Sequence, residues 1–177
     1  MKQRFLLFIF FISMLGSQSC NNKKDVREPN RMNQEQVTEK LVEANIAAIK
    51  VENKQIEKLI DSSGWNMIKT ATGLRYEIIE KGIGPKAEFG KIVSFEYETK
   101  LISGEIIYSS KKSGPKEFRI GSGGVESGLE EGMLLLREGD KARLVIPSYL
   151  AHGLSGDQDK IPPMATLIYT LKLIELK

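Results

Sequence analysis

Few residues in this chain of 177 residues are able to do chemistry, and their spacing excludes the common catalytic arrangements. The chain has one histidine and one cysteine, and it has no HExxH, CxxC or GxSxG pattern, so metal and nucleophile mechanisms have little support. The glycine-rich run 121–124 precedes an expected helix, but no Lys-Ser or Lys-Thr follows it, which favours a plain loop over a phosphate cradle. We therefore expect no metal and no other cofactor.

The last quarter of the chain carries the most informative pattern. Residues 124–153 read GVESGLEEGMLLLREGDKARLVIPSYLAHG, and residues 161–177 read IPPMATLIYTLKLIELK. The first segment predicts a short amphipathic helix, a Glu-Gly-Asp turn and a strand, and the second predicts a Pro-Pro corner before a long strand. Together they resemble the FKBP-type peptidyl-prolyl isomerases, and the match runs without gaps back to Gly90.

The resemblance implies catalysis of rotation about Xaa-Pro peptide bonds, which needs neither a nucleophile nor a metal. The barrier is about 18 to 20 kcal/mol because the amide is stabilised by resonance. An apolar pocket that strips water from the imide carbonyl disfavours the planar form, and a donor that holds the twisted carbonyl binds the transition state more tightly. The implied partners are proline-containing polypeptides.

The resemblance also assigns nine residues to the pocket by their positions in the family pattern. They are Tyr97, Tyr108, Phe118, Val125, Glu126, Leu129, His152, Ile161 and Tyr169. Leu129 stands where many members place a tryptophan that forms the floor. Glu126 stands where a backbone N–H holds a ligand carbonyl, and every residue type except proline keeps that donor.

Two of these positions depart from the family pattern in kind. Tyr108 replaces an aspartate, whose charge it cannot carry at neutral pH, whereas His152 replaces a tyrosine and still offers a donor. The alternative for both is ordinary surface. Lys116 replaces a pocket phenylalanine, and with Lys111 and Lys112 it is most simply part of a solvated loop. Two hypotheses follow: a prolyl isomerase, or a catalytically weak module of the same fold that acts as a chaperone or assembly factor.

The elements that must position these residues are mainly strands. Alternation and turn signals predict strands over residues 72–79, 91–101, 106–108, 117–120, 141–147 and 166–175 and a short helix over residues 127–135. The resembled fold belongs to the α+β class, a curved antiparallel sheet wrapped around one short helix. Residues 64–177 supply its elements in order.

A long amphipathic helix is expected ahead of this domain. Residues 34–63 place apolar side chains at three- and four-residue steps with charged residues between them, and Gly64 ends the run. The apolar face either packs on the domain, spaces it from the membrane, or joins a second copy, as several FKBP-type lipoproteins and periplasmic relatives do. The apolar positions keep no clean heptad, so a homodimer through this helix stays open.

The N-terminus resembles a bacterial lipoprotein signal. Lys2 and Arg4 precede an apolar run of eleven residues, which is too short for a membrane span of about 20 residues. Small residues then lead to Cys20, as in a lipobox, where the cysteine receives a diacylglycerol. We therefore expect residues 1–19 to be a signal peptide, Cys20 to be lipidated, and residues 20–33 to be a flexible tether.

The charge of the chain limits its partners. Loss of residues 1–19, with two basic residues and no acidic one, lowers the formal net charge from +3 to +1. This value argues against nucleic acid as a partner and against electrostatic attachment to a membrane. We expect the lipid to anchor a cell-envelope lipoprotein in the outer membrane, facing the periplasm and acting on exported polypeptides, similar to the gliding-motility-associated lipoprotein isomerases.

Overall fold

The structure, a computed structural model, describes residues 33–177. The signal peptide expected over residues 1–19, the lipidated Cys20 and all but the last residue of the tether expected over residues 20–33 lie outside this range. Within residues 33–177, no helix is both long enough and apolar enough to cross a membrane.

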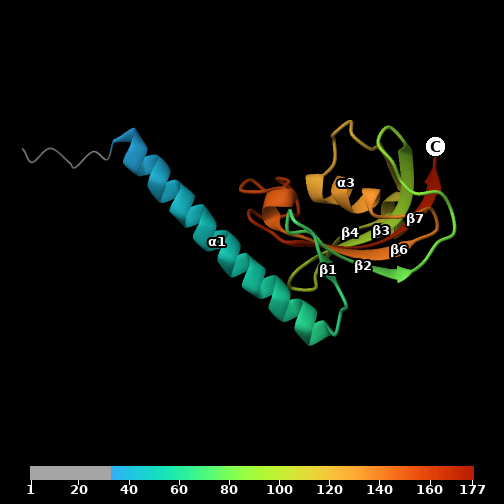
Figure 1. The fold of residues 1–177 in the computed structure, drawn as a ribbon, viewed down its shortest axis with the longest axis horizontal. Coiled ribbons are helices and arrows are strands. Elements are labelled where there is room, and N and C mark those ends of the chain that lie inside the picture. The colour runs from blue at the N-terminus through green and yellow to red at the C-terminus, as the bar shows by residue number, and fades with distance from the viewer. Residues whose placement is uncertain (1–32) are drawn as a thin grey trace, which may run out of the picture. The chain divides into compact units, whose positions relative to one another are not determined.

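A set of antiparallel strands is combined with a few helices, as expected for an α+β protein (Figure 1). In chain order the elements are α1 (Gln34–Ser63), β1 (Ile68–Lys69), β2 (Arg75–Glu80), β3 (Ile92–Leu101), β4 (Ile106–Ser109), α2 (Ser110–Ser113), β5 (Lys116–Arg119), α3 (Ser127–Leu134), β6 (Lys141–Ile146), the 3-10 helix η1 (Ser148–Leu150) and β7 (Leu167–Leu176). The predicted fold class, the long N-terminal helix and the short helix are confirmed. The brief elements β1, α2 and η1 were not predicted.

The seven strands form one antiparallel sheet. Its hydrogen-bonded order is β1-β2-β6-β7-β3-β4, and β5 pairs with β3 outside this path. One edge of β3 pairs with β7 along its length. The other edge is shared, because β5 pairs with residues 92–95 of β3 and β4 pairs with residues 98–100. This arrangement brings β4 and β5, which are separated only by α2 and a short turn, to the same border of the sheet.

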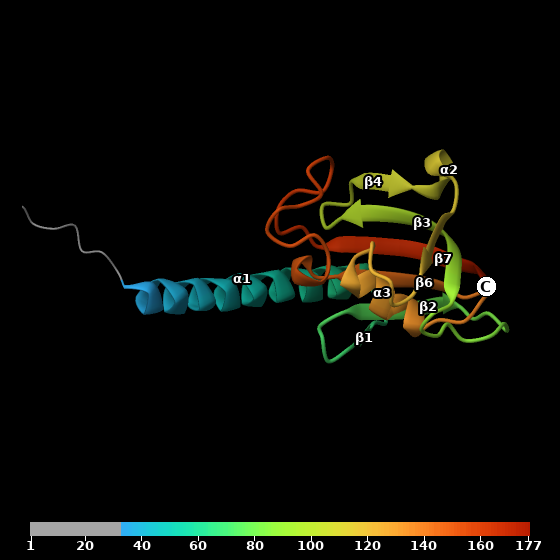
Figure 2. The same ribbon diagram turned by 90° about the horizontal axis from the view of Figure 1, so that it is seen from above.

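Side chains that alternate along β6 build a hydrophobic cluster on each face of the sheet. Leu144 faces the main core, to which α3 contributes Leu129. The next residue, Val145, faces the opposite side and packs with Ile56 and Ile60 of α1. The sheet is therefore covered by α3 on one face and by the C-terminal part of α1 on the other, and Figure 2 shows both helices beside the strands.

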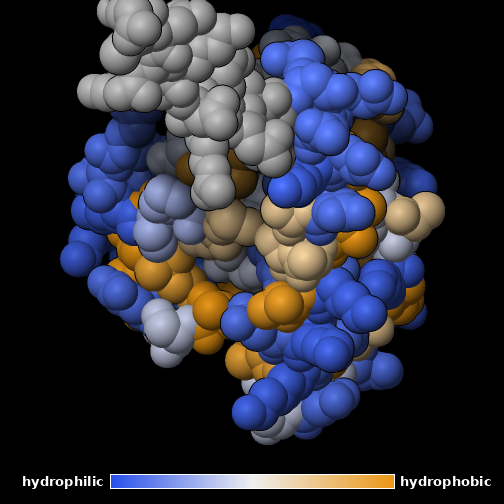
Figure 3. Space-filling view, turned by 90° about the vertical axis from the view of Figure 1, so that its left-hand side faces the viewer, coloured by the Kyte–Doolittle hydropathy of each residue, from blue (hydrophilic) through white to orange (hydrophobic). Residues whose placement is uncertain are grey.

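Only part of the apolar face of α1 is covered. Ile56 and Ile60 are buried, whereas Leu41, Val42 and Ile46 each keep more than half of their surface exposed. Packing on the domain, one of the alternatives for this helix, therefore holds for its C-terminal part. Figure 3 shows hydrophobic side chains, in orange, at the surface between hydrophilic ones, in blue.

Candidate active site

One cavity of about 490 Å³ gathers most of the predicted site residues. Its lining consists of Tyr97, Tyr108, Lys116, Gly124, Val125, Glu126, Ala151, His152, Asp157, Ile161 and Tyr169. Seven of the nine predicted residues belong to this lining. They come from β3, β4, β7, the turn that begins α3 and the loop between η1 and β7, so the fold brings distant segments together as the resemblance implied.

Phe118 and Leu129 are the two predicted residues that the structure does not bring to the cavity. Leu129 is fully buried in the main core, where the first turn of α3 directs it toward the sheet. Phe118 packs edge-on against Phe95, with ring centroids 5.9 Å apart and an interplanar angle of 88°. Leu129 therefore lies within the core and Phe118 packs against it, and neither lines the cavity.

Two tyrosines from neighbouring strands form the aromatic wall of the cavity. Tyr97 on β3 and Tyr169 on β7 have ring centroids 6.2 Å apart and tilted by 38°. They are diagonal neighbours across the strand pair, since Tyr169 lies opposite Thr99. Val125 and Ile161 complete an apolar surface against which a small ring can pack.

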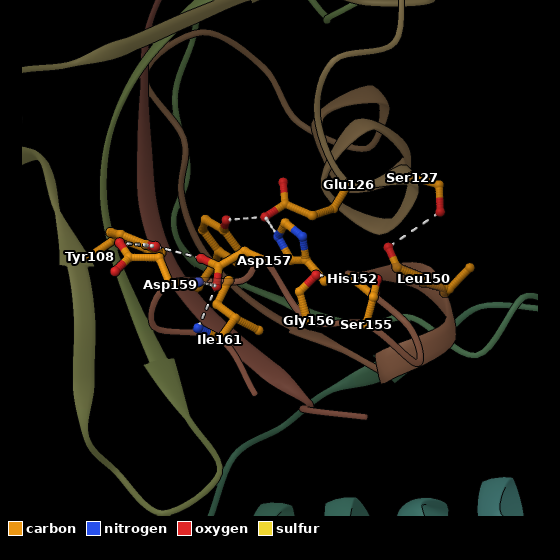
Figure 4. A network of polar contacts seen from close by, with 11 residues as sticks. Tyr108, Glu126, Ser127, Leu150, His152, Ser155, Gly156, Asp157, Asp159 and Ile161 are labelled. Carbon is orange, nitrogen blue, oxygen red and sulfur yellow. Dashed lines mark hydrogen bonds and ion pairs between the residues drawn. The ribbon is translucent and has the colours of Figure 1, made fainter. Parts of the chain in front are cut away.

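Glu126 places a buried carboxylate in this cavity. It is the N-cap residue of α3, but its side chain does not cap the helix. Its Oε1 instead accepts a hydrogen bond from the Tyr169 hydroxyl at 2.8 Å and lies 3.1 Å from His152 Nε2 (Figure 4). Because a carboxylate oxygen only accepts, His152 must carry its hydrogen on Nε2. The side chain of Glu126 is 6% exposed and that of His152 30%.

In this network the Tyr169 hydroxyl stays protonated and donates, whereas the second carboxylate oxygen of Glu126 is left without a donor in the described part of the chain. Burial, together with the Glu126 carboxylate, raises the pKa of Tyr169 far above its ordinary value, so the phenol remains a donor at neutral pH. The other Glu126 oxygen, Oε2, is buried and has no hydrogen-bond partner among the residues that the structure describes. Such an acceptor costs free energy, and this cost is typical of residues retained for function.

The backbone N–H of Glu126, which was predicted to hold a ligand carbonyl, lies at the start of α3. The residue precedes the first turn of α3, where helix geometry provides no intrahelical acceptor for the N–H group. Within residues 33–177, no hydrogen bond from this N–H to a backbone carbonyl is formed. The predicted role of this donor thus has no competing backbone acceptor in the described residues.

Asp157 supplies a carboxylate that the sequence analysis missed. The Tyr108 hydroxyl donates to Asp157 Oδ2, and the backbone N–H groups of Asp159 and Ile161 donate to Oδ1 at 3.0 and 2.7 Å (Figure 4). Burial raises the pKa of Asp157, but these hydrogen bonds outweigh it and lower the pKa to about 2. The hydrogen bond to Asp157, followed by burial, raises the pKa of Tyr108 far above its ordinary value. A tyrosine on β4 and an aspartate on the loop thus stand where the family pattern has an aspartate on the strand.

The cavity is more polar than the apolar pocket that the resemblance implied. Lys116 lines it from β5 and does not belong to a solvated loop, whereas Lys111 and Lys112 are exposed on α2. The lining thus contains one lysine and the carboxylates of Glu126 and Asp157. Only the resemblance pointed to this loop, because no local pattern in the sequence marks Asp157 as a partner of Tyr108.

Comparison with known families assigns the segment that carries the cavity to one family. Residues 84–174, just over half of the chain, match the family described as FKBP-type peptidyl-prolyl cis-trans isomerase. The chain belongs to this family, which confirms the resemblance seen in its sequence.

Solved structures and curated proteins agree with this assignment. The crystal structure of FkpA from Escherichia coli is similar, with a TM-score of 0.64, 28% identity and coverage of 83% of this chain and 74% of that one. A peptidyl-prolyl isomerase from Pseudomonas syringae gives a TM-score of 0.63 and 31% identity, covering 74% of this chain and 94% of that one.

Among curated proteins, the probable FKBP-type isomerase FkpA of Neisseria meningitidis is 43% identical over 108 residues, which are 60% of this chain and 39% of the relative. FK506-binding protein 2 of Yarrowia lipolytica is 36% identical over 111 residues, which are 62% of this chain and 77% of the relative. The chain thus spans about two fifths of the Neisseria protein.

Proposed function

We propose that this protein is a peptidyl-prolyl cis-trans isomerase acting on exported polypeptides at the cell envelope. One observation carries the proposal: within the segment that matches the family, an aromatic wall and an available backbone N–H line the same cavity. A reaction limited by rotation about a resonance-stabilised bond needs this pair of features.

The cavity supplies each feature with its own residues. Tyr97, Tyr169 and Ile161 receive the proline ring and exclude water from the imide, which disfavours its planar, charge-separated form. The N–H of Glu126 donates to the carbonyl as it rotates out of the plane, so that the twisted state is bound more tightly than the planar one. His152, held by the Glu126 carboxylate, presents a polar ring beside this carbonyl position.

A second function, that of a catalytically weak chaperone or assembly module, is favoured by the charges of the cavity. Lys116, Glu126 and Asp157 give it ion-pairing groups that an apolar proline ring does not use. A module that binds extended polypeptides through such groups retains the fold without the rate acceleration.

An isomerisation assay separates the two functions. We expect the protein to accelerate cis-to-trans conversion of Xaa-Pro tetrapeptides, read by NMR exchange spectroscopy so that no coupled protease is needed. A rate equal to that of the uncatalysed reaction across a panel of residues before the proline, together with measurable peptide binding, would replace the enzyme by the binding module.

We also propose the division of the chain that the sequence suggested. Residues 1–19 are a lipoprotein signal peptide, Cys20 carries the lipid, residues 20–33 form the tether, residues 34–63 the helix, and residues 64–177 the isomerase domain. The lone cysteine after small residues supports the anchor.

Mass spectrometry of the mature N-terminus tests the anchor. We expect an acylated Cys20 in the outer-membrane fraction, and Cys20→Ser to accumulate as a precursor or to leave the membrane. An unmodified Cys20 in mature protein would contradict it.

A further inference from the structure

Glu52 of α1 is a second buried carboxylate, and it lies outside the cavity. It is 8% exposed. Its Oε1 accepts from the backbone N–H of Ser148 at 2.7 Å and from the Thr166 hydroxyl at 2.6 Å, and its Oε2 accepts from the Ser148 hydroxyl at 2.9 Å. Both oxygens therefore have donors.

The donors of Glu52 are the two ends of one segment. Ser148 begins η1, with only Pro147 between it and β6, and Thr166 directly precedes β7. The chain between them supplies four residues of the cavity lining, which are Ala151, His152, Asp157 and Ile161. One side chain of α1 therefore joins the start and the end of the segment that forms a wall of the cavity.

We propose that Glu52 is a positioning residue of the active site and that α1 acts through it as a brace for the cavity. Hydrogen bonds to an ionised acceptor are stronger than neutral ones, and shielding from water strengthens them further. By holding residues 148 and 166 together, the carboxylate fixes the closure of the intervening loop. It thereby fixes the position of His152 relative to Glu126. The helix that carries Glu52 lies outside the family match of residues 84–174.

The middle of the same segment is fastened separately. The Tyr108 hydroxyl on β4 holds Asp157, and the backbone N–H of Met164 donates to the Gly153 carbonyl at 2.8 Å. Glu52 therefore acts at the two ends of the segment, beyond the last paired residues of β6 and β7, while Tyr108 acts at its centre. Both ends continue into paired strands, since Ile146 of β6 lies opposite Leu167 of β7. Loss of Glu52 removes the three hydrogen bonds that tie Ser148 and Thr166 to α1, and the loop between the strands can then shift more easily.

A different set of contacts holds α1 on the domain without touching this segment. The guanidinium of Arg75, which is 1% exposed, donates to Glu57 at 2.6 Å and to Asn53 at 2.7 Å. Arg75 belongs to β2, and Glu57 follows Glu52 by little more than one helical turn. Docking of the helix and bracing of the cavity are thus carried by different side chains, and Glu57 provides a matched control.

The test compares Glu52→Ala with Glu57→Ala in the full-length chain, purified in detergent. Because the activity readout rests on the proposed isomerase function, hydrogen exchange of residues 151–161 is measured alongside kcat/KM. We expect Glu52→Ala to lower kcat/KM on the order of tenfold, the factor that matches loss of one charge-assisted hydrogen bond, and to speed exchange in this segment. Glu57→Ala should leave both values within about twofold of wild type, a difference that corresponds to less than one neutral hydrogen bond.

Two further measurements separate positioning from general destabilisation. Trp65, the only tryptophan, packs against the cluster of Ile56 and Ile60, so unchanged fluorescence shows that α1 remains docked. Glu52→Gln should restore most of the activity, because its amide oxygen accepts from the Ser148 N–H while its NH₂ group donates to the Ser148 hydroxyl. If Glu52→Ala does not fold, the isosteric Thr166→Val removes one of the three donors and should give a smaller effect in the same direction.

The outcomes are distinct for the two proposals. Wild-type protein without isomerase activity contradicts the proposed function, while faster exchange in Glu52→Ala but not in Glu57→Ala still supports the brace. Equal kcat/KM and equal exchange in Glu52→Ala and Glu57→Ala overturn the brace. When only Thr166→Val is available, wild-type kcat/KM and wild-type exchange in that variant overturn it as well.

Discussion

Glu52 and Glu126 are both buried carboxylates without a lysine or arginine partner in the described part of the chain, yet their surroundings differ. Glu52 uses both oxygens and is enclosed where α1 meets the ends of β6 and β7. Glu126 uses one oxygen for two donors, leaves the other without a partner, and lines a cavity. A complete network is what a structural brace requires, whereas an incomplete one beside a cavity leaves polar groups at the proposed substrate site.

The largest expected effect is a difference in stability between the two carboxylates. Glu52→Leu strands three buried donors, and we expect a loss of about 3 kcal/mol in the free energy of unfolding. Glu126→Leu removes an unpaired acceptor and strands only one buried donor, the Tyr169 hydroxyl, because His152 is partly exposed, so we expect a smaller loss of about 1 kcal/mol. Urea unfolding measures both values.

Equal losses would end this distinction. Glu57→Leu, on the same helix as Glu52, controls for the effect of placing leucine on α1. Its side chain is 51% exposed, so the new leucine buries little surface, and the loss it causes reports the ion pair with Arg75 alone.

The second prediction concerns the isomerase activity of the cavity that Glu126 lines. Tyr97→Phe combined with His152→Ala removes polar groups from the cavity and little apolar packing, and we expect kcat/KM to fall about tenfold. Tyr76→Phe is the matched control, because Tyr76 packs against the core from β2 and does not line the cavity. A double variant that folds and isomerises peptides as fast as wild type would leave catalysis to desolvation and the backbone N–H of Glu126.

The strands were predictable from the sequence because alternation is a local property. Expected strand ends at residues 91–101, 141–147 and 166–175 differ from those of β3, β6 and β7 by one residue at most. The amphipathic pattern of α1 was equally clear, but a period of 3.6 residues states only that a face is apolar. It does not state which part of that face will be covered, and the structure covers Ile56 while leaving Ile46 exposed.

The family pattern made the positions of most site residues predictable, but it did not make their polar contacts predictable. Seven of nine residues reached the cavity, placed there by strand register, by the turn before α3 and by the loop between η1 and β7. The contact of Tyr108 with Asp157 and that of Glu52 with Thr166 join residues 49 and 114 positions apart. No periodicity links such pairs, since they meet only after the sheet has closed.

A smaller effect on stability is expected from acid titration of Asp157, in the middle of residues 148–166. The folded-state pKa of Asp157, about 2, lies below its ordinary value of 3.8, so its hydrogen bonds stabilise the fold above about pH 4. This contribution is lost as the pH falls toward 2. Tyr108→Phe removes the hydroxyl donor, and we expect its destabilisation relative to wild type, measured by urea unfolding, to be present at pH 6 and to shrink between pH 4 and pH 2.

NMR titration of the Asp157 carboxyl carbon provides the direct check, because Tyr108→Phe should move its midpoint upward. Asp159→Asn is the control, since Asp159 lies 3.3 Å from the Tyr108 hydroxyl and receives the weaker contact. A destabilisation by Tyr108→Phe that is equal at pH 6 and pH 2 would show that Asp157 is not the carboxylate that Tyr108 holds.

The smallest effect on stability is expected at the exposed part of α1, where the comparison between docked and free regions of one helix is sharpest. Ile56→Ala removes packing against Val145 and Ile168 and should cost about 2 to 3 kcal/mol. Ile46→Gln, with 61% of the side chain exposed, should change stability by less than about 0.5 kcal/mol. If the helix joins two copies of the chain, one of the alternatives that its sequence leaves open, Ile46→Gln shifts the molar mass of the Cys20→Ser protein from dimer to monomer in light scattering. A monomeric parent protein would contradict self-association through this face, because the apolar residues would then remain in water without a second copy to cover them.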